Sequence, residues 1–484
     1  MPQFYDTLLR EYIENPGQRG LGLDALADKH FDYEMISYSD ITDKKKLGFE
    51  EVDLKQAAIY SWEDVYMTKK LYDKQKWYFP SKIYDEIEIP LLGVLVDMEL
   101  TGVRIDRDKL KWIGILLENH IRELQKEIYS ISWEEFNISS PKQVGEILFE
   151  KLNLPKGKKT KTGYSVNADV LWNLAKEFPI AQKIIDFRHY SKLLSTYIEG
   201  LLDIATQNDT VHTSYNQAVT ATGRLSSTAP NLQNIPSWDG IAGEIREAFI
   251  PHNPKDILVA FDYSQVEVRL LAIMSWDTNL LEAFKRKRDI HQVTAEFIFG
   301  KKDISGTMRK FAKAVNFGVI YGISPFGLTQ MIDITQKEAR LYIDKFYENY
   351  PKVRDFFDTT IEDCREKNYV KTLFGRRRYI GGINDRNAII KKSAEREAIN
   401  MPIQGTSADI IKIAMIRIQK FLKEWNYKSK MILQVHDELV FNMTPDEKEV
   451  LKPKIKSIME NIFPDAPIPL LVDSGEGKNW KQAK

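Results

Sequence analysis

The sequence has little cysteine, no long apolar run and no excess of either charge. A single cysteine, Cys364, in 484 residues excludes an internal disulfide and fits a reducing compartment. No apolar run approaches 18 residues and no signal peptide is recognised, so we expect a cytoplasmic protein without a membrane partner. The 69 basic residues balance 69 acidic ones. A simple nucleic-acid binder is basic overall, so any anion-binding surface here requires charges segregated into a basic cleft.

What the sequence does contain is a stripe of functional side chains at a strict four-residue spacing. Arg309, Lys313, Phe317 and Tyr321 follow one another at this interval. Because an α-helix has 3.6 residues per turn, each step of four drifts by only about 40°. The spacing therefore predicts one stripe on one helix, with two cations followed by two aromatics. Such a stripe can bind a triphosphate and stack a base. The alternative is a surface helix whose cations lie over packed rings.

Two acidic motifs lie on either side of this helix in the sequence. The apolar run 257–261 predicts a short buried strand that ends at Asp262, and residues 265–275 have helical periodicity. Asp262 thus stands where a strand passes into a helix, although it could simply be a helix N-cap. Residues 431–441 predict a β-hairpin with Asp437 at its polar tip. A solvated turn is the alternative for Asp437.

Together these three segments resemble motifs A, B and C of family A DNA polymerases, the bacterial polymerase I type. The resemblance covers nearly the whole chain, with its motifs in the family's order and at compatible spacings. Further matching segments are residues 220–227, 231–236, 289–291, 396–405 and 475–480. The resemblance implies an α+β right-hand fold, with an antiparallel sheet in the palm, helical fingers, a helical thumb and an N-terminal remnant of an exonuclease-like domain.

The resemblance also divides the chain. The expected parts are a truncated, inactive 3′–5′ exonuclease-like domain (1–80), the first palm segment (81–107), the thumb (108–205), the palm with motif A (206–275), the fingers with motif B (276–410) and the palm with motif C (411–484).

In residues 1–80, Asp6, Tyr60 and Asp64 match later acidic motifs of the exonuclease. The family's first motif, Asp-x-Glu on a leading strand, is absent, so a two-metal nuclease site lacks half its ligands. We therefore expect no proofreading, and Asp6 and Asp64 become ordinary surface or cap residues. The sequence leaves open a truncation or a natural remnant.

Nucleotide addition is an in-line phosphoryl transfer, which two divalent ions about 3.5–4 Å apart can clamp. Mg²⁺ prefers carboxylate and phosphate oxygens. In the family, the positions of Asp262 and Asp437 hold two Mg²⁺ ions, for which Mn²⁺ can substitute. The resemblance adds the backbone carbonyl of Tyr263 as a ligand and gives Glu438 a supporting position behind the ligands.

The remaining nucleotide contacts also follow from the family. Arg309 and Lys313 would bind the triphosphate, with Lys313 protonating the pyrophosphate. His291 would add a phosphate contact, unless it is a buried histidine satisfied within the fold. Tyr321 would stack at the templating position, where Gly322 permits close backbone approach.

Sugar selection is expected to depend on two further positions. The family's motif A acid, here Glu267, packs where a ribose 2′-hydroxyl would lie and favours deoxynucleotides. Phe317, where some relatives have tyrosine, implies discrimination against dideoxynucleotides. Gln265 is also assigned to the dNTP site.

Arg224, Asn400, Gln404 and His436 have donors suited to minor-groove acceptors, which test pair shape without reading sequence. In the family, these positions contact the primer terminus and the nascent pair; amide pairing on a helix surface is the alternative for Asn400 and Gln404. The resemblance assigns DNA contact also to Asn231, Gln233, Asn234 and Arg396.

A Gly-Lys-rich segment in the expected thumb suits phosphate contact on duplex DNA, with a solvated loop as the alternative. Its basic residues are Lys156, Lys158, Lys159 and Lys161. Residues 139–143 predict a helix start with proline in the first turn. One departure from the family is Trp238, which follows a serine where an arginine is usual.

The sequence thus predicts a monomeric, Mg²⁺-dependent DNA-directed DNA polymerase that uses dNTPs and primer-template DNA. Three rivals remain at this point. They are a reverse transcriptase with the same active-site motifs, a decayed polymerase that only binds nucleic acid, and a nuclease acting through the N-terminal acids.

Overall fold

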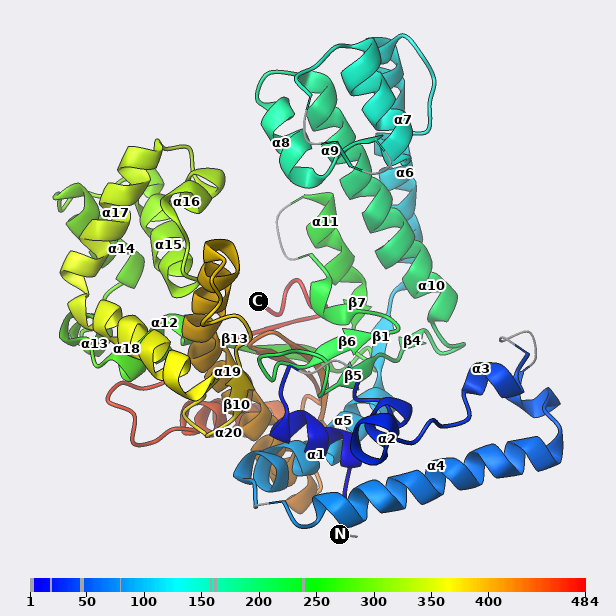
Figure 1. Ribbon diagram of the computed structural model, residues 1–484. Helices are drawn as coiled ribbons and strands as arrows, with labels where there is room; N and C mark the ends of the chain where they lie inside the picture. Colours follow the sequence, from blue (N-terminus) through cyan, green and yellow to red (C-terminus); the bar gives the residue numbers. More distant parts are fainter. Residues whose placement is uncertain are drawn as a thin grey trace.

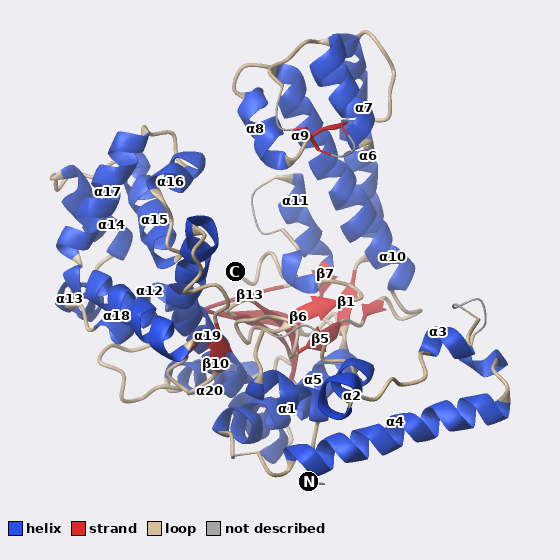
Figure 2. Cartoon of the chain, viewed as in Figure 1, coloured by secondary structure: helices blue, strands red, loops and turns tan. Residues whose placement is uncertain are grey.

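The computed structural model describes residues 4–17, 20–43, 48–78, 80–156, 159–160, 163–236 and 240–484, with the backbone alone at 159–160. Most strands gather at the centre of the molecule, and groups of helices surround them (Figure 2). One helical group rises at the upper right, a second lies on the left, and the N-terminal helices run below (Figure 1).

The central sheet is antiparallel, with the strand order β11-β12-β8-β13. Its strands are β8 (Ile257–Tyr263), β11 (Lys430–Val435), β12 (Glu438–Met443) and β13 (Val472–Gly477). Because side chains alternate along a strand, β8 contributes to two cores. Val259 and Phe261 face the first core, whereas Leu258 and Ala260 face the second. Asp262 follows the alternation of the second set, at the end of the strand.

The first core continues from the sheet into the left-hand group of helices. The helices that contribute side chains to this core are α5 (Ile89–Thr101), α12 (Val266–Ser275), α13 (Thr278–Lys285), α14 (Ile290–Phe299), α15 (Gly306–Ile320), α16 (Pro325–Met331), α17 (Gln336–Asn349), α18 (Pro351–Lys367), α19 (Ala388–Glu424) and α20 (Lys448–Glu460). Helix α19 is the longest and borders both the sheet region and α18 (Figure 1).

The second core lies between the sheet and the base of a long helical hairpin. One arm of the hairpin is α6 (Arg107–Ser132). The other arm is formed by three consecutive helical elements, α9 (Pro179–Lys192), η4 (Leu193–Glu199) and α10 (Gly200–Ile204). Its distal half has a separate core with α7 (Pro141–Glu146), η3 (Ile147–Lys151) and α8 (Ala168–Ala175). The predicted helix start is confirmed, because Ser140 caps α7 and Pro141 is its first residue.

Several short elements complete the fold. They are β1 (Val103–Ile105), β2 (Lys159–Thr160), β3 (Gly163–Tyr164), β4 (Thr210–Val211), β5 (Ser214–Asn216), β6 (Ser226–Thr228), η5 (Leu232–Asn234), α11 (Ile241–Glu244), η6 (Ile245–Ala248), β7 (Phe249–Ile250), β9 (Tyr369–Lys371) and β10 (Arg377–Tyr379). Strands β4, β1 and β7 form a small second sheet.

Helices are the regular elements of the N-terminal region, whose described residues 4–17, 20–43 and 48–78 contain no strand. Its elements are α1 (Thr7–Glu14), α2 (Leu23–Phe31), α3 (Tyr38–Ile41), η1 (Phe49–Glu51) and α4 (Leu54–Gln75), followed by η2 (Ile83–Glu88). As expected, Asp6 is a helix cap, because its carboxylate accepts a hydrogen bond from Leu9 N at 2.8 Å. Across the described parts of the chain, no helix is long and apolar enough to cross a membrane.

Candidate active site

Two carboxylates meet at one end of the central sheet, as predicted. Asp262 is in register with Glu438 across the β8–β12 pair, and Asp437 is the residue before Glu438 in the hairpin turn. The amide of Tyr263 donates a hydrogen bond to the carbonyl of Asp437 at 3.3 Å. Asp262 is not a helix N-cap, because it lies within β8 and Gln265 is the N-cap of α12.

The environment of these carboxylates disfavours their ionisation in the absence of a cation. Burial, reinforced by the charges of Asp437 and Glu438, raises the pKa of Asp262 to about 7. Burial also raises the pKa of Asp437. Oδ1 of Asp262 is buried and has no hydrogen-bond partner. An orphaned carboxylate oxygen beside a second carboxylate fits a hard divalent cation.

These two carboxylates would not complete a metal's coordination alone. In the part of the chain that the structure describes, no group of three or more His, Cys, Asp or Glu side chains could hold a metal ion. The side chain of Tyr263 is committed elsewhere, since its hydroxyl donates to Met459 O at 2.8 Å. Other ligands would therefore be backbone oxygens, water or phosphate oxygens.

Glu438 is held from behind by residues to which the sequence analysis gave no role. The indole N–H of Trp480 donates to Glu438 Oε1 at 2.8 Å. Nη1 of Arg246 lies 3.7 Å from Oε2, and its guanidinium lies 4.0 Å from the centre of the Trp480 ring. Lys484 Nζ is 3.8 Å from the same Oε2. The inclusion of Trp480 in a matching segment was the only sequence signal for this arrangement.

A cavity of about 260 Å³ opens beside the carboxylates. Its lining residues are Gln233, Asn234, Ile235, Pro236, Arg246, Asp262, Val435, His436, Asp437, Glu438 and Lys484. Gln233 Nε2 donates to Gln434 Oε1 at 2.8 Å, and Gln434 Nε2 donates to the carbonyl of His436 at 2.5 Å. Gln434, which the sequence analysis did not single out, therefore links two of the predicted DNA contacts.

Helix α15 carries three of the four residues in the predicted stripe, and the prediction that Tyr321 belongs to the same helix was wrong. The helix ends at Ile320, and Tyr321 is its C-cap. Gly322 follows with φ +63°, and a Cβ there would lie 2.9 Å from Ile399 Cδ1 and Arg396 Cγ of α19. The left-handed glycine ends the helix against α19, although the Tyr321 amide still donates to Phe317 O at 3.2 Å.

The basic end of α15 is exposed and is linked to the start of α14. Arg309 Nε donates to Asp289 Oδ2 at 2.6 Å, while Asp289 Oδ1 caps α14 by accepting from His291 N at 2.9 Å. Lys313 is exposed as well, with its Nζ 6.0 Å from the Phe317 ring centre. Asp289 lies in one of the matching segments, but nothing in its local sequence indicates this pair of contacts.

His291 is buried, with 3% of its surface exposed, and is bonded within the fold. Asn316 Nδ2 donates to its Nδ1 at 2.9 Å, and the Phe317 ring lies 5.6 Å from its ring. Burial lowers the pKa of His291 to about 4, and the charges of Arg309 and Lys313 act in the same direction. With Nδ1 accepting, the ring proton of the neutral histidine is on Nε2.

Glu267 joins three parts of the site. One carboxylate oxygen accepts from Arg224 Nη2 at 2.7 Å, and the other accepts from the Tyr321 hydroxyl at 2.6 Å. Glu267 itself is 8% exposed, whereas Tyr321 is 38% exposed. The motif A helix, the residue after α15 and the segment with Arg224 are thereby connected. Gln265 is half-buried beside them and makes no side-chain cap bond.

The other predicted DNA contacts lie on α19 and near its neighbours. Asn400 and Gln404 are half-buried on α19, and Asn400 Oδ1 is buried without a hydrogen-bond partner. Arg396 is exposed on the same helix. Asn231 caps η5, and Asn234 is exposed at its end.

Part of the predicted lysine-rich contact cannot be placed. Lys156 is exposed, with Nζ 5.6 Å from the ring centre of Tyr164. Lys159 pairs with Tyr164 through the backbone of β2 and β3. Lys158 and Lys161 lie outside the described residues, as does Trp238.

Comparisons with known proteins give a consistent result. The sequence model described as DNA polymerase family A matches residues 107–482. DNA polymerase I of Geobacillus stearothermophilus is 42% identical over 99% of this chain and 55% of the relative. That of Bacillus subtilis is 43% identical with the same coverage, and that of Caldicellulosiruptor bescii is 48% identical over 83% of this chain and 47% of its own length. The chain thus spans about half the length of the curated relatives it matches.

The fold is similar to that of a solved polymerase. The POL domain of Pol1 from M. smegmatis, in complex with DNA primer-template and dNTP, aligns with a TM-score of 0.86 and 33% identity. The alignment covers 99% of this chain and 82% of that domain. It confirms the predicted α+β right-hand polymerase fold, while neither set of relatives supports the reverse transcriptase alternative. Since the family model matches most of the sequence, the chain belongs to DNA polymerase family A.

Proposed function

We propose that this chain is a DNA-directed DNA polymerase that adds deoxynucleotides to a primer 3′-hydroxyl. The observation that carries the proposal is the meeting of Asp262 and Asp437 at the end of the sheet, with the buried Asp262 Oδ1 lacking a partner. Glu267 connects the adjacent motif A helix to Tyr321 at the end of the basic helix α15. Carboxylates, a cationic helix and an exposed aromatic residue thus lie around one centre.

Membership of family A implies divalent metal dependence in general. We propose that Asp262, Asp437 and the carbonyl of Tyr263 hold two Mg²⁺ ions, for which Mn²⁺ can substitute. When bound, the ions supply Lewis-acid stabilisation of the attacking and leaving oxygens. Glu438 supports the hairpin through Trp480 and Arg246, without touching the metal.

The residues of the chain bind and orient the nucleotide. Arg309 and Lys313 project from the exposed side of α15 and bind the triphosphate, and Lys313 donates a proton to the departing pyrophosphate. Neutral His291 donates from Nε2 to a phosphate oxygen, because Asn316 occupies Nδ1. Phe317 packs beside the nucleotide.

Glu267 and Gln265 border the sugar, and Glu267 occupies the space of a ribose 2′-hydroxyl. Tyr321, which is partly exposed, stacks at the templating position.

Primer-template DNA is the proposed partner of a monomer. The contacts would be Arg224, Asn231, Gln233, Asn234, Arg396, Asn400, Gln404 and His436 near the nascent pair, and Lys156, Lys158, Lys159 and Lys161 on the duplex. The proposed subdivision assigns palm, fingers and thumb to the sheet region, the left-hand helices and the long hairpin of Figure 1.

The test is extension of a labelled DNA primer on a DNA template with Mg²⁺ and dNTPs. Asp437→Ala is expected to abolish extension. Asp465→Asn, which alters an exposed carboxylate elsewhere in the C-terminal region, is expected to retain it. Absence of extension by the unaltered chain, or full activity of Asp437→Ala, would contradict the proposal.

A further inference from the structure

The N-terminal region contacts a loop of the polymerase part of the chain. Tyr12, on α1, is 3% exposed, and its hydroxyl donates to the carbonyl of Thr220 at 2.6 Å. Thr220 belongs to the loop between β5 and β6, here called the 217–224 loop. The helix α1 is itself fixed to η2, because the hydroxyl of Tyr84 donates to the carbonyl of Asp6 at 3.1 Å.

The same loop rests on a cluster of buried charges. This four-charge cluster consists of Glu88, Arg376, Asp409 and Lys412, which are 0 to 3% exposed. Gln217, at one end of the loop, donates to the Glu88 carbonyl at 2.9 Å and to its carboxylate at 2.5 Å. At the other end, a Cβ on Gly223 would lie 2.6 Å from Arg376 Nε.

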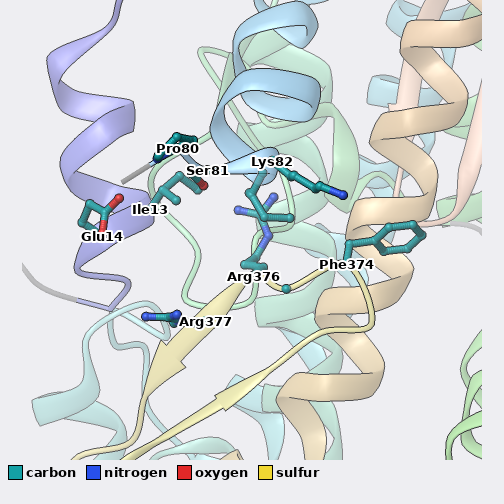
Figure 3. Close-up of a pocket in the computed structure, with 10 residues that line it drawn as sticks. Ile13, Glu14, Pro80, Ser81, Lys82, Phe374, Arg376 and Arg377 are labelled. Carbon is teal, nitrogen blue, oxygen red and sulfur yellow. The ribbon is translucent and has the colours of Figure 1, made fainter. Parts of the chain in front are cut away.

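Figure 3 shows how closely α1 approaches this cluster. Ile13 and Glu14 of α1 line a cavity of about 350 Å³ opposite Arg376, which precedes β10, and Arg377, its first residue. Tyr12, the residue before Ile13, is close enough for the charges of Arg376, Glu88 and Asp409 to act on its hydroxyl. The loop is thus held from three directions, by α1, by η2 and by the β9–β10 turn.

From the loop, hydrogen bonds continue to the candidate active site. Thr220 Oγ1 donates to the carbonyl of Arg224 at 2.7 Å. Arg224 then donates to Glu267 at 2.7 Å, and Glu267 accepts from Tyr321 at 2.6 Å. Tyr12, Thr220 and Arg224 are therefore each hydrogen-bonded to the next residue, through different groups of Thr220 and Arg224, and the last bond reaches the Glu267 carboxylate that is proposed to exclude the ribose 2′-hydroxyl.

We propose that Tyr12 is a positioning residue for sugar selection, and that the N-terminal region serves as a brace which holds the 217–224 loop, Arg224 and Glu267 in register. The proposal rests on the proposed function, because it concerns the same nucleotide site. It gives the exonuclease-like remnant a role that needs no nuclease chemistry.

The hydroxyl, rather than the ring, is the group that carries this role. Burial raises the pKa of Tyr12 to about 12, so the hydroxyl remains a donor near neutral pH. Tyr12→Phe would keep the buried ring and leave the Thr220 carbonyl without this donor. A buried acceptor that loses its partner favours displacement of its segment, which would release Arg224 from its alignment with Glu267.

The test measures kcat/KM for dNTP and for the matching rNTP in single-nucleotide extension by the full chain. For Tyr12→Phe, the dNTP/rNTP ratio is expected to fall about three- to tenfold, as for the loss of one buried hydrogen bond, while kcat for dNTP changes less than about twofold. Thr220→Val removes the hydrogen bond from Thr220 to Arg224, and it should likewise lower the dNTP/rNTP ratio with little change in kcat for dNTP. Neither substitution should lower the ratio further in a Glu267→Ala background.

Tyr33→Phe is the matched control. It also removes a hydroxyl from the N-terminal region, but that hydroxyl bonds Glu63 of α4 at 2.8 Å. An unchanged dNTP/rNTP ratio in both Tyr12→Phe and Thr220→Val, or an equal fall in Tyr33→Phe, would overturn the positioning role. Failure of the unaltered chain to extend the primer would instead refute the proposed function, so the two failures are distinguishable.

Discussion

His291 is a buried base that the fold keeps neutral, and its titration should make the protein acid-sensitive. Burial lowers its pKa from 6.5 to about 4. The unfolded chain therefore takes up the proton first as the pH falls, so this contribution to stability is full above pH 6.5 and is lost towards pH 4. The shift corresponds to about 3 kcal/mol of unfolding free energy.

Denaturant unfolding at pH 7 and at pH 4 would measure this contribution. Between pH 7 and pH 4, the free energy of unfolding is expected to fall by about 3 kcal/mol less in His291→Gln than in the unaltered chain. His120→Gln, at a half-exposed histidine on α6, should behave like the unaltered chain. Equal acid sensitivity of the His291→Gln variant and the unaltered chain would contradict the assignment.

Trp480 should matter to the active site through its N–H group. Trp480→Phe keeps most of the buried ring and removes the donor to Glu438. Because Glu438 is the first residue of the buried strand β12 and directly follows Asp437, we expect a loss of about 1–3 kcal/mol in unfolding free energy, together with slower primer extension. Trp425→Phe, at a tryptophan that is 68% exposed, controls for ring size in both measurements.

At the residue scale, the sequence predicted the acids better than their partners. Asp262 and Asp437 each stand at the end of an apolar strand, so their positions follow from local patterns. Arg246 and Trp480 contact Glu438 only after distant segments have packed together. Nothing in their local sequence indicates that contact. Trp480 lies in a segment that matches the family, but the match does not say which residue its side chain contacts.

At the scale of elements, the end of α15 should be sensitive to a single methyl group. Gly322 and Gly300 both have φ +63°, so alanine is strained equally at the two positions. At Gly300 a Cβ would meet nothing within 4 Å, whereas at Gly322 it would lie 2.9 Å from side chains of α19. Gly300→Ala is expected to cost about 1 kcal/mol, and Gly322→Ala at least about 1 kcal/mol more.

Thermal or denaturant unfolding of the two variants would distinguish backbone strain, which both share, from the steric contact with α19, which only Gly322→Ala makes. Gly322→Ala should also impair primer extension, because the following turn positions Tyr321 against Glu267. Equal stability of the two variants would show that the contact with α19 relaxes without cost.

The end of α15 also shows why one element was predicted incorrectly. A spacing of four residues is the same whether the last member lies in the helix or one residue beyond it. The end is set by Gly322 in the left-handed region and by its contact with α19, which is distant in sequence. Helical periodicity therefore located the helix and its basic face but not the residue at which the helix ends.

At the scale of the whole molecule, the four-charge cluster joins regions that sequence reasoning treated separately. Glu88 ends η2, Arg376 precedes β10, and Asp409 and Lys412 lie on α19. Lys412 Nζ is 2.7 Å from Glu88, and Arg376 contacts both acids. Charged residues are usually exposed, so no local pattern predicts their burial; only the assembled fold brings compensating charges together.

Lys412→Met tests how much the molecule depends on this cluster. The substitution fits the volume of a side chain that is 0% exposed, but leaves two buried acids with one cation. Removing one partner from a buried ionic group costs about 3–5 kcal/mol, so we expect that loss in the free energy of unfolding at pH 7. Lys420→Met, on the same helix but 74% exposed, is expected to change stability by less than about 0.5 kcal/mol.

The pH dependence distinguishes loss of charge compensation from loss of packing. Burial opposes ionisation of Glu88, but Lys412 and Arg376 outweigh it and lower its pKa to about 2. The resulting stability is present above the unfolded pKa, near 4.5, and is lost as the pH falls towards 2. The difference between Lys412→Met and the unaltered chain should therefore narrow between pH 7 and pH 3. A difference that stays constant with pH would mean that Lys412 contributes packing alone, and that the regions meeting at the cluster are held together by their apolar contacts.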